Sequence, residues 1–132
     1  MPDRAAGILL DTSVVVAHLR GQIDIRVLTA PTEPLFLPLV ALGELYKGAE
    51  KSARPAQNRR LIEDFLEMAA LLYPDTATAE SYAKAAAVLE AQGQAIPEND
   101  LWIAAVALEC DMPLATRDAH FDRVDGLAVL HW

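Results

Sequence analysis

Four acidic residues stand where an apolar stretch of the sequence ends or is interrupted. They are Asp11, Glu44, Asp100 and Asp118. Asp11 directly follows the apolar run of residues 7–10, and Glu44 interrupts the mainly apolar segment of residues 39–45. Carboxylates that crowd together repel one another and raise one another's pKa, and a hard divalent cation removes that repulsion. The pattern therefore favours chemistry carried out by cations that carboxylates hold.

The kinds of ligand available indicate which cation to expect. Carboxylate oxygens suit Mg²⁺ or Mn²⁺, whereas zinc sites are built mainly from histidine and cysteine. The three histidines are scattered along the chain, and Cys110 is the single cysteine. Its apolar surroundings favour a packed core position, and a lone cysteine is typical of a reducing compartment. We expect Mg²⁺ or Mn²⁺ as the cofactor.

Each of these residues also has an ordinary structural interpretation. A carboxylate is favoured at the start of any helix, so one acid taken alone predicts little. His120 follows Asp118 by two residues, but a surface or loop histidine is the favoured interpretation, and we leave it outside the predicted site. Trp102 and Tyr46 can stack on an unpaired base, although aromatic residues on helices more often pack in cores or interfaces.

Short apolar runs that alternate with helical patterns must position the acids. Runs typical of buried strands cover residues 7–10, 35–37, 71–73, 114–115 and 127–130. Apolar residues at helical spacing cover residues 14–19, 22–28, 40–50, 61–69 and 82–93, and a further helix starts near residues 96–99 and ends before Pro113. Strands that alternate with helices form a parallel sheet covered on both faces, and 132 residues suit one domain.

The order of these elements predicts where the acids meet. Open parallel sheets bind their ligands beyond the carboxyl ends of the strands. Asp11 and Asp118 follow strands there, Glu44 lies in the first turns of a helix after a strand, and Asp100 begins the helix after a proline turn. We expect all four acids at one edge of the sheet.

The overall charge restricts the possible partners. A net charge of -8 argues against a protein that coats nucleic acid, because such binding depends on many basic side chains. Basic residues cluster within residues 47–60, as either a local basic surface or a solvated helix face. The apolar content of 53% leaves surface for a partner. With no apolar run of roughly 20 residues and no signal-peptide pattern in residues 1–5, we expect a cytoplasmic protein.

Four sequence blocks surround the acids in a fixed order. They are LLDTS at residues 9–13, GELYKG at 43–48, IPENDLWIAA at 96–105 and LATRDAHF at 114–121, before a short strand near Val129. Together, over nearly the whole chain, they resemble the PIN-domain nucleases, and within them the VapC-type toxins of bacterial toxin-antitoxin pairs.

The resemblance implies a fold and a set of site residues. The fold is a three-layer α/β/α sandwich with a central, mainly parallel sheet, formed by one domain over residues 1–132. The residues that fall on the family's acidic positions are Asp11, Glu44, Asp100 and Asp118, with Thr12, Asn99 and Thr116 as neighbours that order them. The family varies at the fourth acid, so Asp122 is an alternative to Asp118.

The resemblance also implies a function. It indicates a metal-dependent endoribonuclease that forms a homodimer, cleaves RNA and is inhibited by an antitoxin protein that inserts a segment against the acids. We expect Asp11, Asp100 and Asp118 to coordinate the cations, and Glu44 to bind a second ion or orient the attacking water.

Two other functions stay open at this point. One is a catalytically silent PIN-like module that only binds a partner protein. The other is a phosphoacceptor receiver domain, which has a similar length, a parallel sheet and acids at strand ends. A receiver needs a lysine after a late strand, and Lys47, Lys51 and Lys84 do not occupy such a position.

Overall fold

Five parallel strands form the central sheet of the protein. The computed structural model describes residues 7–132, so the expectation about residues 1–5 lies outside the described part. The strands are β1 (Ile8–Leu10), β2 (Leu35–Pro38), β3 (Ala70–Leu72), β4 (Leu114–Thr116) and β5 (Val129–His131). Their order across the sheet is β3-β2-β1-β4-β5, and each neighbouring pair is parallel. The predicted α/β fold is confirmed.

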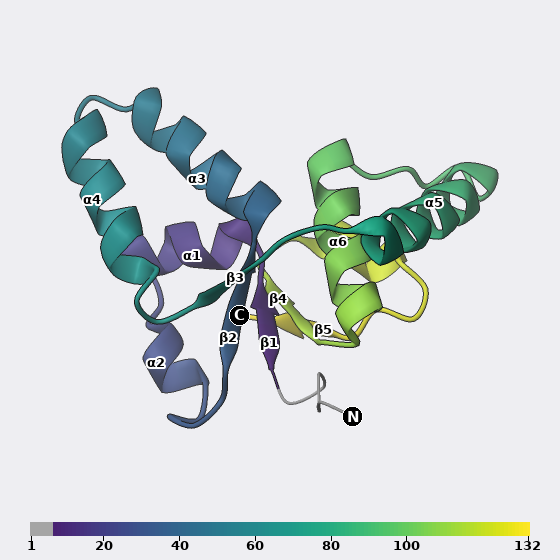
Figure 1. Ribbon diagram of the computed structural model, residues 1–132, viewed down its shortest axis with the longest axis horizontal. Coiled ribbons are helices and arrows are strands. Elements are labelled where there is room, and N and C mark those ends of the chain that lie inside the picture. Colours follow the sequence, from purple (N-terminus) through teal and green to yellow (C-terminus); the bar gives the residue numbers. More distant parts are fainter. Residues whose placement is uncertain (1–6) are drawn as a thin grey trace.

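Helices cover both faces of this sheet. They are α1 (Thr12–Leu19), α2 (Ile25–Leu28), α3 (Leu39–Glu50), α4 (Pro55–Phe65), α5 (Thr76–Ala91) and α6 (Glu98–Cys110), with the 3-10 helix η2 (Ala119–Arg123). Figure 1 shows α1, α3 and α4 on one side of the strands and α5 and α6 on the other. The protein is therefore an α/β/α sandwich, as the sequence predicts.

The central strand explains both the core and the place of the site. Leu9 and Leu10 in β1 are fully buried, because helices cover the strand on both faces. β1 pairs with β2 on one side and with β4 on the other. The strand order changes direction between β1 and β4, and at such a switch point the loops that leave two neighbouring strands separate. The first predicted acid, Asp11, directly follows β1.

Several helix bounds differ from those that the sequence predicts. α4 ends at Phe65, although apolar spacing continues to Ala69. The spacing continues because Ala69 is also buried, but in the turn that precedes β3. α5 begins at Thr76, before its apolar stripe, because Asp75 accepts a hydrogen bond from the backbone N–H of Thr78 and caps the helix. Within residues 7–132, no helix has the length and apolar character needed to cross a membrane.

Candidate active site

Asp11 is a buried acid at the carboxyl end of β1. Only 2% of its surface is exposed, and its Oδ2 accepts hydrogen bonds from Ser13 Oγ at 2.7 Å and Thr116 Oγ1 at 2.8 Å. Asp11 occupies the position before α1 without a side-chain cap, because its carboxylate turns toward β4 instead. Burial raises the pKa of Asp11, and the two hydroxyl donors offset only part of that rise.

Thr116 joins Asp11 to the segment that follows β4. Its hydroxyl is fully buried and also accepts a hydrogen bond from the backbone N–H of Asp118 at 3.0 Å. Ser13 makes a parallel link, since its Oγ accepts from the backbone N–H of Arg117 at 3.0 Å. Two segments far apart in the sequence are thus held in one arrangement at the edge of the sheet.

Glu44 joins three helices at the same edge. Its Oε1 accepts a hydrogen bond from Thr12 Oγ1 at 2.6 Å, and its Oε2 accepts from Asn99 Nδ2 at 3.3 Å. Thr12 begins α1 and Asn99 lies in the first turn of α6. Two of the three neighbours that the resemblance implies, Thr12 and Asn99, therefore contact Glu44.

Asp100 and Asp118 form a cluster with His120. His120 Nε2 lies 2.5 Å from Asp100 Oδ2, and His120 Nδ1 lies 3.4 Å from Asp118 Oδ1. The three side chains offer ligand atoms that all lie within 4.8 Å of one another. The interpretation of His120 as a surface or loop residue outside the site was wrong, since its side chain is only 21% exposed and contacts both acids.

The charges of the other two acids act on Asp100. Burial is the main cause that raises the pKa of Asp100, and the negative charges of Asp11 and Glu44 raise it further. The hydrogen bond with His120 opposes this rise. Asp11 and Glu44 are therefore each close enough to Asp100 to repel its charge, and Asp118 is linked to Asp100 through the contacts of His120.

The donor set fits a divalent cation. Several carboxylates that repel one another at a partly buried edge are stabilised by a cation that prefers oxygen ligands. Asp118 belongs to the cluster, whereas its alternative, Asp122, forms an ion pair with His131 at 2.9 Å. Sequence reasoning missed Ser13 and His120, and the only signal for either was its position two residues after a predicted acid.

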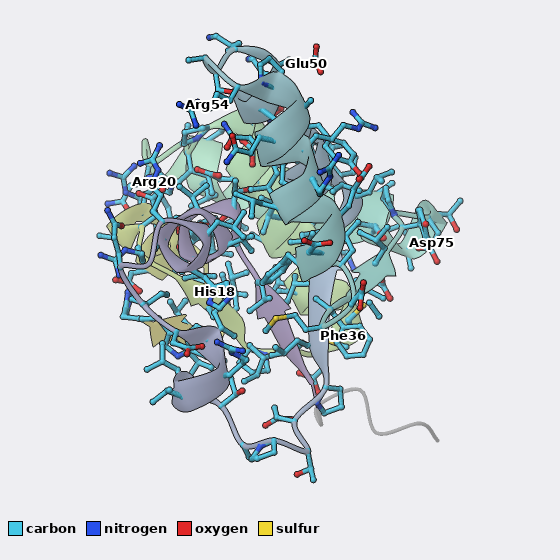
Figure 2. The ribbon with its side chains drawn as sticks, turned by 90° about the vertical axis from the view of Figure 1, so that its left-hand side faces the viewer. His18, Arg20, Phe36, Glu50, Arg54 and Asp75 are labelled. Carbon is cyan, nitrogen blue, oxygen red and sulfur yellow. The ribbon has the colours of Figure 1, made fainter. Side chains whose placement is uncertain are left out.

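Basic and aromatic side chains lie on or near α3 and α6, the helices that carry Glu44 and Asp100. The side chains of Lys47 and Arg54 are exposed on α3 and near the turn between α3 and α4, and Figure 2 shows Arg54 there, on the same side of that view as Arg20. Arg59 lies over the ring of Tyr46 at 4.3 Å. Trp102 stacks on Tyr82 of α5 with ring centroids 4.0 Å apart. The basic residues thus form an exposed surface beside the helix that carries Glu44.

A mainly apolar groove lies between α1, α3 and α4. Its lining residues include Val16, Leu19, Leu45 and Leu61, and Glu44 and Arg20 also line it. Leu61 is 43% exposed, which is unusual for a large apolar side chain that packs beside a core. The groove therefore places apolar surface next to one of the site's acids.

Comparisons with known proteins agree on one family. The sequence profile of the PIN domain matches residues 8–127. Ribonuclease VapC1 of Haemophilus influenzae is 33% identical over 129 residues, which are 94% of this chain and 96% of that protein. Ribonuclease VapC5 of Mycobacterium tuberculosis is 35% identical over 94% of this chain and 91% of its own length.

Solved structures show the same likeness. The VapBC2 structure from Rickettsia felis, bound to a DNA fragment from its promoter, superposes with a TM-score of 0.89 at 25% identity, over 95% of this chain and 98% of that one. The VapBC-1 structure from nontypeable Haemophilus influenzae superposes with a TM-score of 0.85 at 33% identity, over 95% of this chain and 97% of that one.

Proposed function

From the premise that this chain belongs to the PIN-domain family, and within it to the VapC type, we propose that it is a metal-dependent endoribonuclease. Acting as a single domain, it is the toxin of a bacterial toxin-antitoxin pair. Relatives named ribonuclease that align over nearly the whole chain support this proposal. The observation that supports it most is that the charges of Asp11 and Glu44 act on Asp100, which shares His120 with Asp118.

The proposed cofactor is Mg²⁺ or Mn²⁺. A bound divalent cation lowers the pKa of water and neutralises charge on the phosphate. Asp11, Asp100 and Asp118 are the residues that would hold it, and Asp11 is kept in place by Ser13 and Thr116. Glu44, which Thr12 and Asn99 fix in orientation, would hold a second ion or orient the attacking water.

The proposed substrate is RNA in the cytoplasm. The net charge of -8 opposes broad binding to nucleic acid. The exposed basic side chains on α3 and at the α3-α4 turn supply local positive charge beside Glu44, and divalent cations in the site add to it.

The proposed partners are an antitoxin and a second copy of the chain. The groove between α1, α3 and α4 suits an apolar segment of an antitoxin, and Glu44 is one of its lining residues. A segment bound there with a basic side chain at Glu44 would block the acids. The structure neighbours are toxin-antitoxin complexes, which supports such a partner for this chain.

The two alternative functions are not favoured. A silent binding module has no need to hold a half-buried Asp100 against the charges of Asp11 and Glu44. A receiver domain needs a lysine after a late strand, whereas Lys84 lies on α5 and Lys47 and Lys51 lie at α3.

Cleavage of RNA with and without metal tests the proposal. The purified chain is incubated with structured RNAs in Mg²⁺ or Mn²⁺, and then with a chelator. We expect cleavage that the chelator stops and that Asp11→Asn abolishes without unfolding the protein. Asp64→Asn, on the exposed face of α4, is the matched control and should cleave normally. Cleavage that survives in Asp11→Asn would refute the role of Asp11.

A further inference from the structure

His120 is placed between two carboxylates that the proposed function assigns to the metal. Its Nε2 faces Asp100 and its Nδ1 faces Asp118, so both ring nitrogens point toward acids. The ring is half-buried, at 21% side-chain exposure, and does not extend freely into solvent. A histidine that only interacts with solvent at the surface does not need contacts with an acid at both ring nitrogens.

The short helix η2 fixes the position of the ring. Phe121, the next residue, is fully buried in the core, and its ring centroid lies 5.3 Å from that of His120. Arg123 Nη1 donates a hydrogen bond to the backbone carbonyl of Ala95 at 3.2 Å. At the other end, the backbone N–H of Asp118 donates to the buried hydroxyl of Thr116. The turn that carries His120 is therefore anchored at both ends.

The spacing suits one shared cation. Ligand atoms around a first-row divalent ion lie at roughly 2.0–2.3 Å from it and so stand at most about 4.5 Å apart. One atom each from Asp100, Asp118 and His120 lies within 4.8 Å of the others, so the three residues are close enough to share one ion. Histidine ligands commonly donate their second ring N–H to a carboxylate, so one nitrogen of His120 can bind the ion while the other keeps an acid as its partner.

We infer that His120 is a nitrogen ligand of the cation held by Asp100 and Asp118, and that it makes this site prefer Mn²⁺ over Mg²⁺. This inference rests on the proposed metal site and adds a ligand to it. Imidazole suits first-row transition ions, whereas Mg²⁺ takes oxygen ligands almost exclusively. A site in which an imidazole joins the carboxylates therefore gains more affinity for Mn²⁺ than for Mg²⁺.

Electron paramagnetic resonance of bound Mn²⁺ tests the inference without RNA. The full chain is stripped of metal and loaded with one equivalent of Mn²⁺, and electron spin-echo modulation is recorded. A directly bound imidazole adds a ¹⁴N modulation to the echo. We expect this modulation in the wild type and in the control His131→Gln, whose ring contacts Asp122 instead. We expect it to be lost in His120→Gln.

Competition between the two ions gives a second readout. His120→Gln should lower the Mn²⁺ affinity by about tenfold or more and leave the Mg²⁺ affinity nearly unchanged. Circular dichroism checks that the variant is folded. If the variant does not fold, the ¹⁴N modulation of the wild type alone still tests the inference. A wild-type echo without ¹⁴N modulation overturns the inference, and so does an equal loss of affinity for both ions.

The outcomes separate this inference from the proposed function. Protein that cleaves RNA in a metal-dependent way but shows no ¹⁴N modulation is a ribonuclease in which His120 is not a ligand. If the protein shows the modulation but cleaves none of the RNAs, His120 is a metal ligand and the proposed ribonuclease function is refuted.

Discussion

Thr116 is a single buried hydroxyl that serves two partners. It donates to Asp11 Oδ2 and accepts from the backbone N–H of Asp118. Thr116→Val keeps the shape but leaves both partners without that hydrogen bond. We expect a loss of about 1–3 kcal/mol in the free energy of unfolding, because buried polar groups without partners are costly. We also expect RNA cleavage to fall by about tenfold or more, because the acids lose their support.

A second buried threonine supplies the control. Thr78 is also fully buried, and its hydroxyl bonds to Asp75 and Glu109 away from the acidic edge. Thr78→Val should cost similar stability in urea unfolding and leave the cleavage rate per folded molecule unchanged. Equal losses of cleavage in both variants would show that Thr116 acts through general stability alone.

The raised pKa of Asp11 gives a testable dependence of stability on pH. The folded protein holds this proton more tightly than the unfolded chain, whose carboxyl keeps a pKa near 3.8. Without divalent cations, ionisation of this carboxyl lowers the free energy of unfolding as pH rises. The fall begins near the pKa of the unfolded chain and ends above the raised pKa of the folded protein. Asp11→Asn removes this pH-dependent loss of stability, because asparagine does not ionise.

Unfolding experiments at several pH values measure the difference. Asp11→Asn should be more stable than the wild type at neutral pH in chelator, and the difference should shrink below pH 3.8, where both states of the wild type are protonated. Added Mn²⁺ should stabilise the wild type more than the variant. A difference that stays constant with pH would contradict the burial of an ionised Asp11.

The acids could be predicted from the sequence, but their partners could not. Asp11 and Glu44 stand out because each departs from an apolar background. His120 carries no such mark, and its contact with Asp100 spans 20 residues. Ser13 is equally inconspicuous. Such contacts depend on how two loops lie against each other, which periodicity does not encode.

At the scale of elements, apolar runs located all five strands, because strands buried on both faces are continuously apolar. Helix ends were harder to predict. Because Ala69 is buried in the turn after α4, apolar residues at helical spacing continue beyond the last turn of that helix. The polar first turn of α5 is set by the cap at Asp75, where no apolar stripe exists to mark it.

The end of α6 offers a prediction about an element. Asp111 follows the helix with a φ of 54°, in the left-handed region that glycine adopts without strain. We expect Asp111→Gly to raise the free energy of unfolding by about 0.5–1 kcal/mol, and Asp111→Ala to lower it. Thermal unfolding of the two variants measures this, and a stabilising alanine would refute the role of the backbone conformation.

At the scale of the whole molecule, charge is distributed unevenly despite the net value of -8. Lys47 lies three residues after Glu44 on α3, so both occupy one side of that helix. Lys47→Glu should weaken RNA binding and reduce the slope of affinity against salt by about one. Binding is measured in an Asp11→Asn background, so that the RNA stays intact.

Lys84 provides the matched control for this charge reversal. It is exposed on α5, on the other side of the sheet from α3 (Figure 1). Lys84→Glu changes the net charge by the same amount and should leave RNA binding nearly unchanged. Equal effects of the two reversals would show that RNA responds to total charge and not to a surface beside the acids.

The hydrogen bond between Asp11 and Thr116 joins residues that are 105 positions apart. During translation, Asp11 leaves the ribosome 105 residues before Thr116. Until β4 and η2 emerge, a nascent chain lacks the partners that hold its first acid in place. Premature termination before that point should therefore yield an inactive product, so the proposed activity belongs only to chains that extend past η2.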